Sequence, residues 1–128
     1  MRTLIIVAAL AAAALPASTQ AQPPAPAPAS CRIPSWITIV HGNQAVAEMS
    51  IRQSGASLTG RGGEGRNTGK LKGRVSGRDV EFSIQWSNEH RGLYTGRISQ
   101  SGRLSGANSD ATDMRSQTTW FVRELIRC

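Results

Sequence analysis

Residues 93–106, "LYTGRISQSGRLSG", decide the fold of this chain. Apolar and polar residues alternate on both sides of a central Ser-Gly pair, a pattern typical of two antiparallel strands joined by a short turn. Yet Gly96 and Gly106 lie inside these strands, where glycine has no side chain to pack. Similar short stretches, Leu-Thr-Gly-Arg and Leu-Lys-Gly-Arg, occur at residues 58–61 and 71–74. A sheet that repeats glycine at such positions needs a physical reason for it.

The rest of the chain after residue 31 alternates in the same way. The clearest run is 79–86, where Val80, Phe82, Ile84 and Trp86 are separated by polar residues. Short turn signals divide the runs, and short connections join neighbouring antiparallel strands. Strands are predicted near 35–41, 44–53, 57–62, 69–75, 79–86, 92–100, 103–109 and 117–125, with looser stretches at 62–67 and 110–115.

The repeated glycines share a face with apolar neighbours. Gly73, for example, lies between Leu71 and Val75, whereas Lys72 and Arg74 point to the opposite face. A sheet that coils tightly and closes on itself uses inward glycines as kinks. The sequence therefore predicts an all-β fold, a small up-and-down antiparallel barrel of about eight strands. Duplicated hairpins would also explain the repeat, and would also give a barrel. The glycines with this structural role are Gly60, Gly73, Gly96 and Gly106.

The first part of the chain has the features of a targeting segment. A basic start, an apolar run from Leu4 to Leu15 and small residues up to Ala21 predict a signal peptide over residues 1–21. A retained membrane anchor is the alternative, but the run is shorter than a spanning helix requires. Residues 22–30 are rich in Pro and Ala and predict an extended linker. Residues 31–128 form the predicted domain, exported to the periplasm or secreted, with no transmembrane segment after signal removal.

Cys31 and Cys128 are the two cysteines of the chain and bound the predicted domain. Export favours a disulfide between them over two free thiols. A closed meander pairs its first strand with its last, which brings the two ends of the domain together. The disulfide would then close the barrel between its ends.

At this level the domain resembles the calycin group, the barrels of lipocalin and avidin type. Trp36 and Arg123 stand where that group packs a tryptophan of the first strand against a basic side chain of the last. Residues 56–60, "ASLTG", are similar to an avidin stretch, and Trp86, Tyr94 and Trp120 fall at comparable strand positions. The resemblance implies a small barrel that carries a ligand.

The aromatic residues have two interpretations. Trp36, Trp86, Tyr94 and Trp120 are all predicted to face inward together with Phe82. They fill the core of so small a barrel, or they line a pocket at one mouth for a small apolar or planar ligand. The candidate ligand-binding residues are Trp86, Tyr94 and Trp120.

The charge of the chain suggests a second kind of partner. Its 15 Lys and Arg outnumber its 8 Asp and Glu, for a net charge of +7. Basic exported domains meet anionic envelope polymers, although a basic surface can also be merely solvated. No motif predicts specific nucleic-acid recognition. The residues predicted to form one outer basic band are Arg61, Lys70, Lys72, Arg74, Arg97 and Arg103.

Residues suited to catalysis are few. His41 and His90 are predicted to be solvated turn residues, and no spacing matches a metal site, a nucleophile motif or a cofactor loop. We therefore expect a non-enzymatic binding protein without metal or cofactor, most simply a calycin-like carrier of a small ligand. The alternative is an envelope-interaction or inhibitor protein that uses its basic outer surface.

Overall fold

The computed structural model describes residues 12–18 and 31–128. Residues 12–18 are exposed and belong to no helix or strand. The rest of the predicted signal peptide and all of the predicted linker lie outside the described residues. In the part of the chain that is described, no helix has the length and apolar character needed to cross a membrane.

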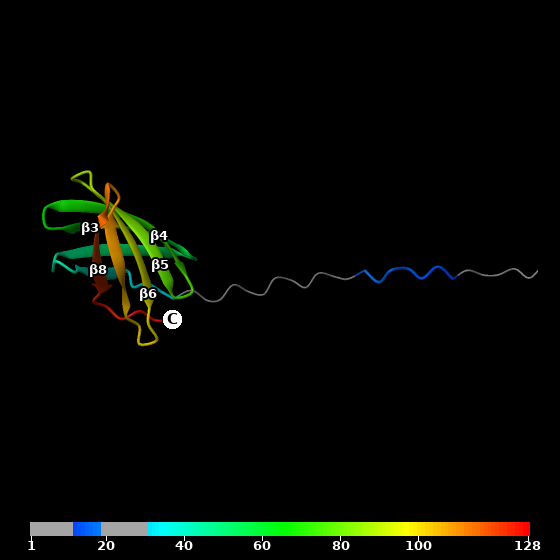
Figure 1. Ribbon diagram of the computed structural model, residues 1–128. Helices are drawn as coiled ribbons and strands as arrows, with labels where there is room; N and C mark the ends of the chain where they lie inside the picture. Colours follow the sequence, from blue (N-terminus) through cyan, green and yellow to red (C-terminus); the bar gives the residue numbers. More distant parts are fainter. Residues whose placement is uncertain (1–11, 19–30) are drawn as a thin grey trace, which may run out of the picture.

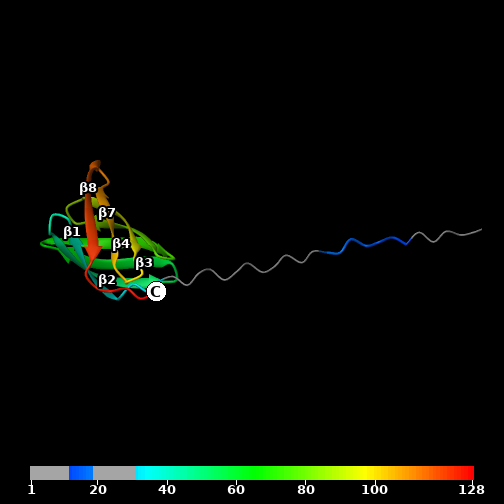
Figure 2. The ribbon, with the colours of Figure 1, turned by 60° about the horizontal axis from the view of Figure 1, so that its bottom comes forward.

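Residues 31–128 form a closed barrel in which each strand pairs antiparallel with its neighbour in sequence, and β1 pairs with β8 (Figures 1 and 2). The predicted fold class is therefore confirmed, and so is the disulfide between Cys31 and Cys128. The strands are β1 (Trp36–His41), β2 (Val46–Ser54), β3 (Ser57–Glu64), β4 (Asn67–Ser76), β5 (Asp79–Trp86), β6 (Arg91–Ile98), β7 (Leu104–Asp110) and β8 (Asp113–Val122).

The two stretches predicted to be loose belong mostly to strands. β3 continues to Glu64 and β4 begins at Asn67, so that only Gly65 and Arg66 connect them. Gly65 has a φ of +58°, which a tight hairpin turn requires and glycine adopts without strain. β7 and β8 likewise extend to Asp110 and Asp113. The glycine-rich and polar composition of these two stretches suggested loops, but their residues form the ends of long hairpins.

The last strand ends earlier than predicted, at Val122. The carboxylate of Glu124 accepts hydrogen bonds from the backbone N–H of Thr38 at 2.6 Å and from its hydroxyl at 2.7 Å. Burial opposes ionisation of Glu124, but these hydrogen bonds outweigh it and lower its pKa. The chain after β8 is thus attached to β1 by this side chain and by the N–H of Arg123, which donates to the carbonyl oxygen of Thr38 at 2.9 Å.

Three aromatic rings fill the middle of the barrel. Phe82 stacks on Tyr94 with ring centroids 4.7 Å apart, and Trp120 meets Phe82 edge-on at 5.2 Å. The Trp120 indole N–H donates to the carbonyl oxygens of Ala107 at 2.9 Å and Thr95 at 3.2 Å. Trp120 is only 2% exposed. Its ring is therefore a core residue with a satisfied polar group.

The glycine repeat makes room for this ring. Gly96 and Gly106 are direct partners across β6 and β7. A Cβ on Gly96 would lie 2.8 Å from Cζ2 of Trp120, and one on Gly106 would overlap the carbonyl oxygen of Thr95. The strands and the indole approach so closely because neither residue has a side chain. This is the physical reason for glycine inside these strands.

Trp36 does not face inward as predicted. It is 50% exposed, whereas Ile37 and Ile39 are buried. The alternation of β1 places these two residues and His41 inside, so its first residue points outward. The predicted packing of Trp36 against Arg123 stays a prediction.

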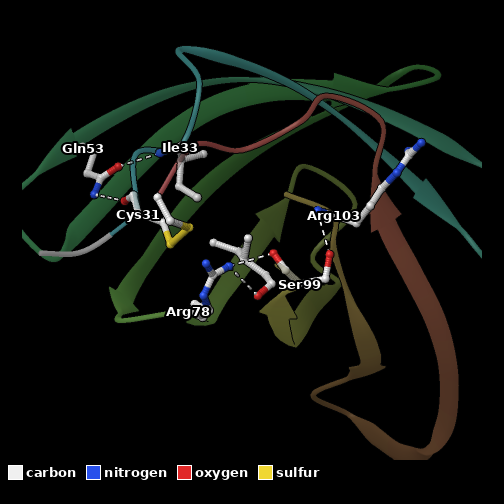
Figure 3. The surroundings of a disulfide bond; sticks show 8 residues. Cys31, Ile33, Gln53, Arg78, Ser99 and Arg103 are labelled. Atoms are coloured by element: carbon white, nitrogen blue, oxygen red, sulfur yellow. Dashed lines mark hydrogen bonds between the residues drawn. A yellow bond between two sulfur atoms is a disulfide. The ribbon is translucent and has the colours of Figure 1, made fainter. Parts of the chain in front are cut away.

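One end of the barrel is closed by the two terminal segments. Cys31, Ile33 and Ile126 are buried there beside the disulfide. The side chain of Gln53 accepts from the N–H of Ile33 at 2.8 Å and donates to the carbonyl of Cys31 at 2.9 Å (Figure 3). The N–H of Ile126 donates to the carbonyl of Gly102 at 2.9 Å. The described segments 31–33 and 124–128 thus cover this end of the barrel.

Candidate functional site

The open end of the barrel holds a hollow of about 290 Å³. It lies where β1, β3, β5 and β7 end and where β6 and β8 begin, the end opposite the C-terminus in Figure 1. Both aromatic and ionisable side chains face it. Its lining residues are His41, Asn43, Glu64, Trp86, His90, Gly92, Tyr94, Asn108, Ser109, Asp110, Ser116 and Thr118.

Two of the three candidate ligand-binding residues line this hollow. Trp86, the last residue of β5, packs partly against the core and forms an aromatic wall. Tyr94 is 3% exposed and presents its hydroxyl to the hollow. Trp120 does not line the hollow, because its ring is buried against Phe82 and Tyr94. It therefore supports the site from the core without facing a ligand.

Glu64 is a site residue that the sequence analysis missed. It ends β3 on the same face as Leu58, which is buried in the core. Its carboxylate lines the hollow, with 31% of the side chain exposed. Extending the alternation of this strand by two residues beyond Gly62 would have placed a carboxylate inside the barrel mouth. The glycine-rich composition of 62–67 concealed that signal because it suggested a loop.

His41 is not the solvated turn residue that was predicted. It ends β1 on the inward face and is 8% exposed. Its Nδ1 lies 3.1 Å from the carbonyl oxygen of Ala45, which can only accept, and its Nε2 lies 2.8 Å from the hydroxyl of Tyr94. In the neutral ring the proton is therefore on Nδ1, and Nε2 accepts from the hydroxyl. Glu64 stands 3.8 Å from the same Nδ1.

The hydroxyl of Tyr94 is held in its protonated form. Burial raises the pKa of this phenol far above its usual value, and the negative charge of Glu64 raises it further. A protonated hydroxyl donates to Nε2 of His41, which agrees with the tautomer deduced from the backbone contact. The floor of the hollow is thus a fixed chain of hydrogen bonds running from Tyr94 to the carbonyl of Ala45.

A second polar pair lies at the rim. His90 is in the β5–β6 turn, as predicted, and its Nδ1 lies 2.7 Å from Oδ2 of Asp110 at the end of β7. The hydroxyl and the backbone N–H of Thr112 donate to the other oxygen of Asp110 at 2.6 and 2.8 Å. These bonds, and then His90, lower the pKa of Asp110 from 3.8 to about 2. The rim therefore carries a permanent carboxylate.

The charge of the hollow is opposite to that of the whole chain. Glu64 and Asp110 line it, and no lysine or arginine does so among the described residues. The net charge of the chain is +7. No group of three or more His, Cys, Asp or Glu side chains in the described part could hold a metal ion. The arrangement offers an aromatic wall, hydrogen-bonding groups and negative charge to one small molecule.

The six basic residues predicted to form one band are divided in the structure. Arg61, Lys70, Lys72 and Arg74 are neighbours on the outer face of β3 and β4. Arg97 lies on β6 and forms an ion pair with Asp79 at 2.8 Å, and Arg103 belongs to the β6–β7 connection at the closed end. The prediction of a single band is wrong for these last two, because β5 separates them from the other four.

Comparisons with known proteins give no family for this chain. No protein-family model matches it, and no curated protein shows significant similarity to it. The resemblance to the calycin group therefore stays a prediction.

Proposed function

We propose that this protein is a non-enzymatic binding protein that holds one small, planar, positively charged ligand in the open mouth of its barrel. The observation that carries this proposal is the hollow in which Glu64 and Asp110 accompany the ring of Trp86, with no lysine or arginine of the described residues beside them. A cation over an indole face gains from the ring quadrupole, and a nearby carboxylate adds to the attraction.

The polar floor of the hollow and the filled core limit the kinds of ligand that can bind. Phe82, Tyr94 and Trp120 pack against one another in the middle of the barrel and occupy the space that a long apolar molecule would need. Asn108, Ser116 and Thr118 line the hollow, and amide and hydroxyl oxygens of this kind can accept hydrogen bonds from a ligand. A planar group bearing N–H donors suits these partners better than the apolar ligand expected from the sequence.

Benzamidine and benzoate test the proposal, since they are planar molecules of similar size and opposite charge. We expect benzamidine to change the tryptophan fluorescence of the protein and benzoate to leave it unchanged. Glu64→Gln should weaken benzamidine binding about tenfold or more, and Trp86→Leu should weaken it and remove the fluorescence response. Glu48→Gln is the matched control, because Glu48 is exposed on the outer face of the neighbouring strand.

The proposal fails under either of two results. One is equal binding of benzoate and benzamidine. The other is an affinity for benzamidine that is the same in Glu64→Gln and Glu48→Gln. Unfolding midpoints of the three variants show whether each protein is folded when it is titrated.

We also propose that the protein is exported. The disulfide supports this location, because such bonds persist in oxidising compartments. The mass of the intact protein outside the cytoplasm should correspond to a chain starting near Gln22 with both cysteines oxidised. A chain that stays in the cytoplasm with two thiols that can be alkylated would contradict export.

A further inference from the structure

The outer surface of β2, β3 and β4, which lie side by side in Figure 2, carries a cluster of positive charge away from the mouth. We define the basic face by five exposed residues: Arg52, Arg61, Lys70, Lys72 and Arg74. Arg61 and Lys70 are direct cross-strand partners, and Thr59 stands between Arg52 and Lys72 in the next row. We propose that the basic face binds a linear anionic polysaccharide.

The charges of the basic face are available to a partner. None of the five residues forms an ion pair within the described part of the chain, in contrast to Arg97, which Asp79 neutralises. Glu81 stands opposite Arg74 in the register of β4 and β5 without forming such a pair. Five cations held together by the sheet repel each other, and an anionic partner relieves that repulsion.

The spacing of the charges suits a chain of repeated anions. Lys70, Lys72 and Arg74 alternate along β4, so their Cα atoms are about 7 Å apart, and neighbouring strands add a step of about 4.8 Å. The closed barrel keeps these positions fixed. A linear polymer with one charge on each sugar can therefore meet several cations at once without ordering a loop.

The side chains between the cations favour a sugar polymer. Ser50 and Thr59 line a shallow hollow of about 470 Å³ beside Arg52 and Arg61. Thr68, Gln85 and Ser87 line a second one of about 650 Å³ beside Lys70. Hydroxyl and amide groups bond to sugar hydroxyls, whereas single-stranded nucleic acid needs several aromatic platforms for its bases. Among the aromatic residues that the structure describes, only Trp86 lines either hollow.

Heparin hexasaccharide is the probe for this proposal, with single-stranded DNA of equal charge as the competitor. We expect the protein to bind the saccharide more tightly than the DNA, with an affinity that falls as salt rises. Replacing Lys70, Lys72 and Arg74 by glutamine should lower the affinity about tenfold and reduce its dependence on salt.

A triple variant with the same change in net charge is the control. Arg103, Arg115 and Arg127 are exposed elsewhere on the molecule, and their replacement by glutamine should change the affinity less than about twofold. Equal losses in the two triple variants would mean that net charge alone attracts the polymer, and would overturn the proposal. Tighter binding of DNA would overturn it as well. Glu64→Gln should leave saccharide binding unchanged, which separates this surface from the mouth.

Discussion

Tyr94 connects the core of the barrel to its mouth. Its ring stacks on Phe82, and its hydroxyl bonds to Nε2 of His41 beside Glu64. A phenolate at this position would lose its hydration and face the negative charge of Glu64. The folded protein therefore holds the proton of Tyr94 more tightly than the unfolded chain does.

We predict that Tyr94 ionises only as the protein unfolds in alkali. Because its pKa is raised in the folded state, the stability that it contributes is complete below the unfolded value of about 10. That stability is lost as pH rises through the folded pKa. The chain has a single tyrosine, so tyrosinate absorbance reports this residue alone and can be compared with circular dichroism during the same titration. Ionisation near pH 10 in a folded protein would contradict the prediction, with the guanidinium-unfolded chain as reference.

Strands β6 and β7 depend on the pairing of Gly96 with Gly106. The sequence neighbours of these glycines point outward and are exposed, while the indole of Trp120 occupies the space inside. Glycine normally weakens a strand, but here it allows an aromatic ring to pack on the sheet and to bond to backbone carbonyls of both strands.

We predict that Gly96→Ala destabilises the protein by about 1–3 kcal/mol, the usual cost of overpacking a core. The added methyl would lie 2.8 Å from Trp120 and 2.7 Å from the carbonyl oxygen of Ser105. Thr95→Ala is the control, because this residue lies on the same strand and points outward. Urea unfolding measures both variants, and equal midpoints for Gly96→Ala and the wild type would show that the space is not filled.

At the scale of the whole molecule the two ends of the barrel differ in structure. The terminal segments, the disulfide and the side chain of Gln53 close one end. The β1–β8 seam is short, with three register pairs. The disulfide joins residues separated by 97 positions and so reduces the freedom of nearly the whole domain in its unfolded state.

We predict that the Cys31→Ala, Cys128→Ala double variant loses about 2–5 kcal/mol of stability, as is typical when a small exported domain loses its disulfide. Denaturant unfolding measures the loss, and the wild type in reductant should match the variant. Benzamidine binding at the opposite end should persist below the unfolding transition. An unfolding midpoint unchanged by reduction would mean that strand pairing alone closes the barrel.

The sequence by itself determined the strand order, the closure and the disulfide. Alternation is a local property, and short turns leave few ways to connect antiparallel strands. The glycines at 60, 73, 96 and 106 could be assigned to the inner face for the same reason. Composition was misleading at 62–67 and 110–115, where strands continue through residues typical of loops.

Only the tertiary structure decided what the inside contains and where the site lies. Alternation places Trp86, Tyr94 and Trp120 on one face, but the depth of each ring depends on strand tilt and on its cross-strand neighbours. His41, Glu64 and Tyr94 come from strands far apart in sequence, and no local pattern specifies the distances between their side chains. The tertiary structure also decided which basic residues lie together. Their proximity depends on which strands pair and not on how often arginine and lysine occur.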